Sequence, residues 1–431
     1  MLVTDDVLTF PRLAVYREKE DYIIHNYLVS SWIVLNQQEY EIAHEMIYNK
    51  KSPQGLIDEQ YDASLVKRVI GLIRLYKIDS FKVDTENKQS MHKPVPKSVY
   101  FVTTYKCNLN CVYCYAESSP NRSMDNDIST EEAKRVITEV KELGTKTIVF
   151  TGGEAFLRKD LVELMEYSDS LGLHVHMISN GSFISNKEIA NKIAEITKLV
   201  TISLDSMIED EHDKNRGKGS WQKAKKAIDL LLEAGCKLKI NQTITKNNMD
   251  AVEDVIDYTN KNNIRLIIAP VASLGRGKTH EHELNYVQRI KIENTIINKQ
   301  PNFDAVNQFY IKNHCGHAYS EFSVDSKGDV FPCKIMHNPQ FLGGNVKDKS
   351  LEEIYYESPV FTASRNRITD NLPICGKCTF KHMCGGGCRA IQWSDTDSID
   401  GTNTEECKII KSNLKKHMWN YFRKSKEEVP S

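Results

Sequence analysis

The sequence predicts an α/β protein whose central part has parallel strands covered by outer helices, with a smaller unit on each side. Three observations predict this fold class. Strand-like and helix-like segments alternate for about two hundred residues after Ser98, a short run of strands and helices precedes them, and seven of the eleven cysteines gather in an irregular region from about Asn313. A chain of 431 residues is too long for one typical domain, so two or three cores are expected.

The N-terminal unit, residues 12–78, combines strand and helix patterns. Alternating segments predict short strands, and apolar residues at helical spacing predict helices, with Ser52, Pro53 and Gly55 breaking the chain between them. This order suggests a winged-helix-like module. We expect strands at 13–18, 21–30 and 32–36, and helices at 37–50 and 64–78.

Residues 79–97 are polar and end in two prolines, which indicates an interdomain linker. The alternating series that follows implies parallel strands with catalytic groups at their carboxyl ends. Its strands are expected at 98–105, 147–153, 174–181, 199–205, 237–245 and 265–271, and its helices at 131–143, 160–171, 188–197, 221–235 and 251–262.

Composition and charge narrow the class of protein. Hydrophobic residues make up 40% and charged residues 27%, an ordinary globular composition. The N-terminus lacks the basic region of a signal peptide and no apolar run approaches a membrane span, so we expect a cytoplasmic protein with no membrane contact. The net charge of -1 gives no basic footprint for nucleic acid. In such a chain, eleven cysteines favour metal or cluster ligation over disulfides.

The first group of reactive residues follows the strand expected at 98–105. Cys107, Cys111 and Cys114 are close enough to bind three irons of a 4Fe-4S cluster and leave the fourth iron open. A zinc knuckle is the alternative, but zinc sites usually need a fourth protein ligand and neither His nor another Cys lies nearby. The spacing therefore favours a catalytic cluster whose open iron chelates a ligand.

This motif, with Tyr113 before its last cysteine and Thr-Gly-Gly-Glu at 151–154, resembles the radical S-adenosylmethionine (SAM) superfamily. The resemblance implies a partial (β/α)6 barrel in which the open iron binds SAM. An electron then cleaves SAM to methionine and a 5'-deoxyadenosyl radical, which abstracts hydrogen from the substrate. The resemblance assigns these residues to SAM: Tyr113, Gly152, Gly153, Glu154, Asn180, Ser203, Asp205 and Arg216.

Residue chemistry fits these roles. Glycines 152 and 153 let the backbone approach a ligand closely, and Glu154 can accept a charge-assisted hydrogen bond from the methionyl ammonium. Ser203 and Asp205 match the position that contacts the ribose, and Arg216 matches an Arg that pairs with the SAM carboxylate. Asn180 ends another strand and is expected to face the cofactor. The Gly-Arg-Gly segment at 275–277 could close the barrel near the adenine.

The second group of reactive residues resembles the SPASM extension of radical SAM enzymes, which holds two auxiliary 4Fe-4S clusters. The resemblance implies that one auxiliary cluster takes four ligands: Cys375, Cys378, Cys384 and Cys407. The other takes only Cys315, Cys333 and Cys388, because the further cysteine that anaerobic sulfatase-maturating enzymes carry soon after the first is absent here. One iron is then open. Two structural zinc ions are the alternative.

The N-terminal unit resembles the PqqD-like recognition element of ribosomal peptide maturases, which captures a leader peptide as an added strand. A winged helix could instead bind DNA, but residues 1–93 hold twelve Lys and Arg against fourteen Asp and Glu. That net charge of about -2 opposes phosphate binding. A stabilising domain without a ligand is the remaining alternative.

Together these features predict three units: a recognition domain with linker at 1–90, a radical SAM core at 91–312 and an auxiliary-cluster domain at 313–431. The function they favour is a radical SAM maturase, supplied by a flavodoxin-type or ferredoxin-type electron donor, that forms thioether crosslinks in a ribosomal precursor peptide. Carbon-carbon crosslinking, epimerisation and sulfatase-type maturation are the enzymatic alternatives. A peptide-binding iron-sulfur redox or regulatory protein is the non-enzymatic one, although such a protein would not need Glu154 or Arg216.

Overall fold

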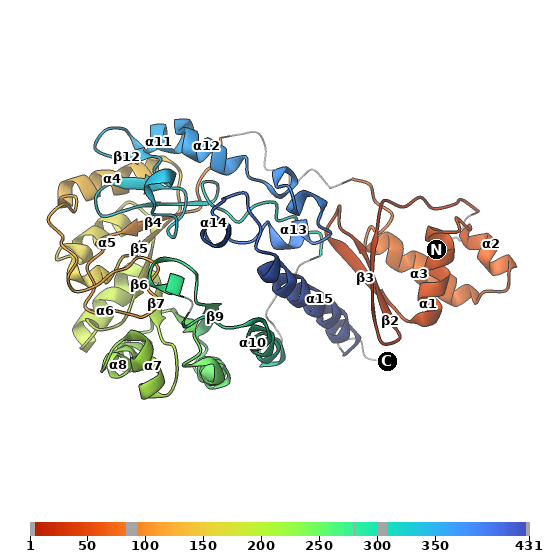
Figure 1. Cartoon of the computed structure of the whole chain (residues 1–431), viewed down its shortest axis with the longest axis horizontal. Coiled ribbons are helices and arrows are strands. Elements are labelled where there is room, and N and C mark those ends of the chain that lie inside the picture. Colours follow the sequence, from red (N-terminus) through yellow and green to blue (C-terminus); the bar gives the residue numbers. More distant parts are fainter. Residues whose placement is uncertain (1–4, 83–92, 280, 300–307, 428–431) are drawn as a thin grey trace.

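A computed structural model describes residues 5–82, 93–279, 281–299 and 308–427 (Figure 1). Its N-terminal domain is an antiparallel sheet in the order β1-β2-β3, followed by helices that bury one face of it. The three predicted strands and two predicted helices are confirmed. The elements are β1 (Ala14–Glu18), β2 (Asp21–Asn26), β3 (Ser31–Leu35), α1 (Gln37–Ile47), α2 (Pro53–Asp58) and α3 (Ala63–Leu75).

Helix α2 corrects the prediction that residues 52–55 only break the chain. The Ser52 hydroxyl accepts a hydrogen bond from the Gly55 N–H, and Pro53 occupies the first helical position. Both residues favour a helix start, because the cap pairs an otherwise unsatisfied N–H and proline has none to lose. The predicted linker lies partly outside the described residues.

The central domain confirms the predicted α/β fold. Six parallel strands lie side by side in sequence order, as a partial (β/α)6 barrel requires. The strands are β4 (Ser98–Val102), β5 (Thr147–Thr151), β6 (His174–Ser179), β7 (Thr197–Ser203), β8 (Leu238–Ile244) and β9 (Arg265–Pro270). The expected helices are α4 (Thr130–Glu142), α5 (Leu161–Ser170), α6 (Lys187–Ile196), α8 (Ser220–Glu233) and α9 (Val252–Lys261); α7 (Glu209–Arg216) and α10 (Tyr286–Lys299) were not expected.

The C-terminal region continues the sheet of the barrel, a pairing that the sequence did not predict. Strand β10 (Glu321–Val324) pairs in parallel with β4, and β11 (Asp329–Phe331) and β12 (Gly344–Asn345) extend the sheet to nine strands in the order β12-β11-β10-β4-β5-β6-β7-β8-β9. Five helices complete it: α11 (Leu351–Glu357), α12 (Pro359–Arg365), α13 (Lys381–Cys384), α14 (Arg389–Thr396) and α15 (Thr404–Glu427).

Helix α15 joins the two ends of the molecule. In Figure 1 it extends from the C-terminal region to the N-terminal sheet. Ile23 and Trp32 of that sheet pack against Leu414, Met418 and Trp419, and the indole N–H of Trp32 donates to the Met418 carbonyl at 3.3 Å. The N-terminal domain is thus held by an apolar contact. Among the described residues, no helix is both long and apolar enough to span a membrane.

Candidate active site

The predicted catalytic cysteines face one cavity of about 410 Å³ at the carboxyl ends of the barrel strands. In parallel α/β folds this is the edge where loops can assemble a site from several strands. Predicted residues that line the cavity are Cys107, Cys111, Tyr113, Cys114, Gly152, Gly153, Asn180, Ser203 and Arg216. Residues far apart in the sequence therefore meet at this one place.

Glycines 152 and 153 bring the loop after β5 against the loop that carries the cysteines. The Gly153 N–H donates to the Thr104 carbonyl at 2.8 Å, and the Glu154 N–H donates to the Lys106 carbonyl at 2.9 Å. A Cβ on Gly153 would lie 2.3 Å from the Lys106 oxygen. The glycines are thus required for contact between two backbone segments, a reason that the sequence analysis did not foresee.

Glu154 lies behind the cavity wall and is 1% exposed. Its carboxylate accepts hydrogen bonds from the Ser179 hydroxyl and the Asn180 N–H, both at 2.9 Å, and from the Phe156 N–H at 3.3 Å. Burial raises the pKa of this carboxyl, and these hydrogen bonds oppose the rise. In this arrangement the carboxylate connects the ends of β5 and β6. Its contact with the methionyl ammonium of SAM stays a prediction.

Asp205 also lies behind the wall, where it pairs with Arg216 rather than lining the cavity as a ribose contact. The two side chains form a buried bidentate pair, with both Arg216 nitrogens 2.9 Å from the carboxylate oxygens. The carboxylate also accepts from the Tyr113 hydroxyl and, at 3.1 Å, from the Thr243 N–H. Arg216 lines the cavity, so Asp205 acts by orienting this cation.

Asn180 contacts the cysteine loop directly. Its amide donates to Asn108 Oδ1 at 2.9 Å and lies 3.8 Å from the Cys107 sulfur. Its own oxygen accepts from the Ser182 N–H at 2.9 Å, which orients the side chain. Asn180 can thus stabilise a thiolate at Cys107, which adds a second role to the predicted one of facing the cofactor.

The donor chemistry of this loop fits an iron-sulfur cluster. Cys107 and the two other thiols of the motif interact electrostatically, and burial raises the pKa of Cys107 to about 12 and that of Cys111 above its usual value. Such thiols ionise when a metal binds them. Across the described residues, no three or more His, Cys, Asp or Glu side chains are grouped to hold a single ion. The three thiols that line one cavity suit a 4Fe-4S cluster in which three irons take one thiolate each and the fourth is open.

The seven C-terminal cysteines lie at two places in the structure, and their assignment to two auxiliary clusters stays a prediction. Four thiols line a common cavity of about 230 Å³: Cys375, Cys378, Cys384 and Cys407. Cys333 instead interacts electrostatically with Cys315 and Cys388. The remaining thiol, Cys236, packs against the barrel core between α8 and β8.

His317 belongs to the three-cysteine set, and the sequence analysis missed it. Its Nδ1 lies 3.0 Å from the Cys315 sulfur. Burial alone would raise the pKa of that thiol, but hydrogen bonds from His317 and from backbone N–H groups outweigh burial and lower the pKa to about 7. The sequence feature that could have identified His317 is its position two residues after Cys315. Because its ring nitrogen contacts the sulfur, His317 orients this thiolate.

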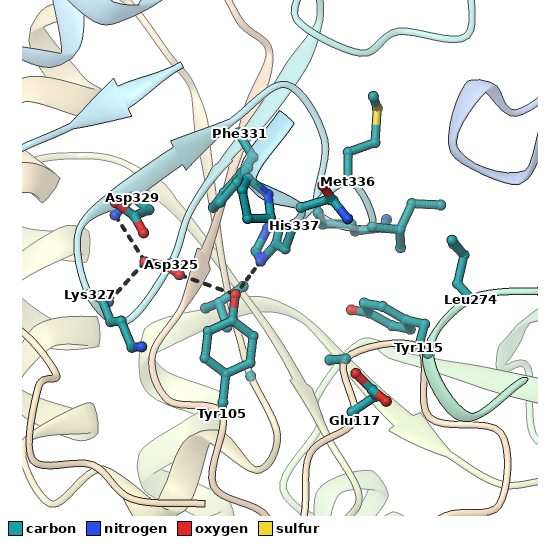
Figure 2. Close-up of a pocket in the computed structure, with 18 of the residues that line it drawn as sticks. Tyr105, Tyr115, Glu117, Leu274, Asp325, Lys327, Asp329, Phe331, Met336 and His337 are labelled. Atoms are coloured by element: carbon teal, nitrogen blue, oxygen red, sulfur yellow. Dashed lines mark hydrogen bonds between the residues drawn. The ribbon is translucent and has the colours of Figure 1, made fainter. Parts of the chain in front are cut away.

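A second cavity of about 650 Å³ adjoins the first, and Tyr115, Gly152, Lys334 and Ile335 line both. Figure 2 shows the Tyr105 hydroxyl between His337 and Asp325, with Tyr115 across the pocket. Tyr105 bonds to Asp325 at 3.2 Å and to His337 Nδ1. This network was not predicted, because Tyr105 is more than 200 residues away in sequence from both Asp325 and His337.

Burial sets the ionisation of this network. It raises the pKa of Asp325 to about 6 and lowers that of His337 to about 4, so the imidazole is neutral near pH 7. The other nitrogen of His337 bonds to the Ser323 hydroxyl at 2.7 Å. The second cavity thus presents a continuous hydrogen-bonded chain beside the predicted radical site.

Comparisons with known proteins agree with this geometry. Residues 101–259 match the radical SAM superfamily, and residues 315–379 match the SPASM iron-sulfur cluster-binding domain. The chain is 28% identical to mycofactocin maturase MftC of Mycobacterium ulcerans over 319 residues, 70% of this chain and 85% of that protein. It is 25% identical over 394 residues to AlbA, a subtilosin biosynthesis protein of Bacillus subtilis, with 85% and 87% of the two chains covered.

The fold is also that of Streptococcus suis SuiB. The structure of SuiB bound to S-adenosylmethionine superposes with a TM-score of 0.60 and 17% identity, covering 92% of this chain and 98% of SuiB. Its complex with the precursor peptide SuiA gives 0.59 and 16%, over 93% and 98%. This chain therefore contains a radical SAM domain and a SPASM iron-sulfur cluster-binding domain within one α/β radical SAM fold.

Proposed function

We propose that this protein is a maturase of a ribosomally synthesised peptide and that it forms thioether crosslinks from cysteine sulfur to carbon. The observation that carries the proposal is the three-cysteine set of Cys315, Cys333 and Cys388. Closing a 4Fe-4S cluster takes four thiolates, and the remaining cysteines of the chain belong to other groups or to the barrel core. A substrate cysteine is a suitable fourth donor, because thiolates are soft ligands that iron-sulfur clusters prefer.

The two adjoining cavities support this assignment. A 4Fe-4S cluster on the catalytic cysteines, with SAM on its open iron, supplies the 5'-deoxyadenosyl radical. Lys334 and Ile335 directly follow Cys333 and line both cavities, so the wall that separates SAM from the larger cavity begins at the three-cysteine set. A peptide carbon in the larger cavity lies between the radical source and the sulfur donor, which is the proximity that bond formation needs.

The proposed thioether-forming reaction balances in atoms and electrons. A carbon-sulfur bond forms while one C–H and one S–H bond break; the hydrogen atom leaves on 5'-deoxyadenosine, and the thiol proton and one electron leave separately. The Asp325 carboxylate lies in the larger cavity as a proton acceptor, and the Tyr105 hydroxyl donates a hydrogen bond to it. We propose three 4Fe-4S clusters; an auxiliary cluster held by Cys315, Cys333 and Cys388 would accept the surplus electron. The electron for SAM cleavage comes from a low-potential flavodoxin or ferredoxin.

The N-terminal domain is proposed to bind the leader of the precursor as an added strand, in the manner of PqqD-like elements. The order β1-β2-β3 leaves β3 at an edge of the sheet. At the start of this edge, Trp32 exchanges two hydrogen bonds with the Gln308 side chain, at 3.0 and 2.8 Å, and the Ser30 carbonyl accepts from the Phe309 N–H at 2.9 Å. The Gln308 side chain and the Phe309 N–H thus occupy only the start of this edge, and a leader would pair with the rest of β3 or displace this contact.

The relatives support a peptide substrate. MftC carries the name of a mycofactocin maturase, AlbA acts in the biosynthesis of the bacteriocin subtilosin, and SuiB was solved with its precursor peptide SuiA. The AlbA match reaches 85% of the chain, more than the radical SAM and SPASM matches cover.

Mass spectrometry of the precursor after anaerobic turnover tests the proposal. The substrate to test is a short cysteine-containing peptide, sought among the genes beside this one, and its product is analysed with and without iodoacetamide. Each thioether should remove two hydrogens and protect one cysteine from alkylation. A loss of two hydrogens with every cysteine still alkylated would indicate carbon-carbon crosslinking or dehydrogenation. An unchanged mass with deuterium taken up from solvent would indicate epimerisation, and a sulfatase encoded nearby would redirect the search for a substrate.

A further inference from the structure

The segment after β9, residues 272–278, touches both the catalytic cysteine loop and the C-terminal domain; we name it the strap. Its central residue is Arg276. The guanidinium donates to the Cys111 carbonyl at 2.8 Å through Nε and to the Ser118 carbonyl at 2.9 Å through Nη2. The Arg276 N–H donates to the Cys114 carbonyl at 3.1 Å. One residue thus holds three carbonyls across the loop that carries the catalytic thiols.

Gly275 makes this close approach possible. Its φ of 52° lies in the left-handed region, and a Cβ there would lie 2.4 Å from the Tyr115 oxygen and 2.6 Å from the Cys114 oxygen. A larger residue would push the strap away from the loop and carry Arg276 with it. The contact is therefore built into the backbone of both segments.

The other end of the strap is bound to α14 of the SPASM region. The Ser394 hydroxyl donates to the Ser273 carbonyl, and the Ser273 hydroxyl bonds to Asp395. Lys278 lies over the Trp393 ring, 5.5 Å from its centroid. The strap is also a wall between the two cavities, because Arg276 lines the smaller one and Leu274 and Gly275 line the larger one.

We infer that Arg276 is a positioning residue that sets the shape of the catalytic cysteine loop and couples it, through the strap, to helix α14. A guanidinium suits this role, since its planar fork can donate to two carbonyls at once, which a lysine ammonium does with less geometric precision. The two ends of the catalytic cysteine loop are already joined, because the Cys107 N–H donates to the Ser119 carbonyl at 3.1 Å. Arg276 therefore adds contacts across a loop whose ends are fixed. The inference holds whatever bond the enzyme makes.

Hydrogen exchange of residues 107–119 in the full-length protein before cluster reconstitution gives a readout that is independent of activity. Losing two charge-assisted hydrogen bonds in Arg276→Gln should speed exchange of this loop at least tenfold. Arg276→Lys should fall between this variant and the wild type. Arg265→Gln removes an exposed arginine from β9 nearby and should match the wild type. Unchanged exchange in Arg276→Gln would overturn the positioning role.

Two further measurements test the coupling. Ser394→Ala removes a hydroxyl at the far end of the strap and should speed loop exchange in the same direction but less; exchange equal to the wild type would reject the link to α14. In reconstituted protein, Arg276→Gln should alter the electron paramagnetic resonance signal of the reduced catalytic cluster and weaken SAM binding about tenfold. The auxiliary-cluster signals should be unaltered, and an unaltered catalytic signal would contradict the inference.

Discussion

Replacing Asp205 with Asn should destabilise the barrel more than any exposed charge change. Asp205 is fully buried, and its carboxylate accepts two hydrogen bonds from Arg216, one from the Thr243 N–H and one from the Tyr113 hydroxyl. Asparagine keeps the volume but offers one acceptor oxygen and turns an amide N–H toward a guanidinium. Arg216, with a side chain only 8% exposed, would then be a buried cation without its counter-charge.

The magnitude follows from this burial. Removing one partner of a buried ion pair costs about 3 to 5 kcal/mol, and the retained oxygen of asparagine places this variant near 3 kcal/mol. With a denaturant slope near 3 kcal/mol per molar urea, the unfolding midpoint should fall by roughly 1 M. Hydrogen exchange of the β7 peptide across a urea series reports this transition. SAM affinity should fall about tenfold, because Arg216 loses the contacts that orient it in the cavity.

A matched control is Asp229→Asn on α8. Its carboxylate lies 3.9 Å from Lys225 and is 63% exposed, so its loss should change the midpoint very little. If the Asp205 and Asp229 variants unfold at the same urea concentration, the buried pair does not stabilise the barrel. If only SAM affinity changes, the pair orients Arg216 without contributing to folding.

The remaining predictions concern cluster loading, pH and packing. The triple alanine variant of the catalytic cysteines should lose reductive SAM cleavage but retain about eight of about twelve irons per chain, by iron assay and deoxyadenosine detection; wild-type deoxyadenosine formation would refute the catalytic assignment. Burial lowers the pKa of His25 to about 3, so the unfolded chain binds this proton better, and stability should fall by about 1.4 kcal/mol per pH unit as pH drops from 6.5 toward 4. Urea unfolding at several pH values should show that His25→Leu lacks this slope while the exposed His174→Gln keeps it. Gly153→Ala should push the cysteine loop away from the loop after β5, at Lys106, and abolish catalytic-cluster loading, measured by iron content. Gly71→Ala has open space around its Cβ in α3 and should stabilise the protein by about 1 kcal/mol in thermal unfolding. Normal loading in the Gly153 variant would show that the loop can move aside.

The parts of the fold that the sequence predicted are those that depend on residue patterns within a single strand or helix. The strand and helix alternation of the barrel is a periodicity within single elements, and each of its strands was found where the pattern placed it. Helix α2 was missed because Ser52 and Pro53 serve equally as chain breakers and as helix starters. The parallel pairing of β10 with β4 left no trace in either segment, since strand pairing depends on partners more than 200 residues apart.

For the candidate site, the sequence by itself indicated the chemistry: three closely spaced thiols with one cluster position open, and seven further cysteines that the resemblance to SPASM proteins divides into two groups. Tertiary structure alone decided which groups face the cavity. It turned Asp205 toward Arg216, put His317 against the Cys315 sulfur and brought Arg276 onto the catalytic loop. The physical reason is that ligand type resides in a side chain, whereas orientation depends on hydrogen-bond partners that folding brings from distant parts of the chain.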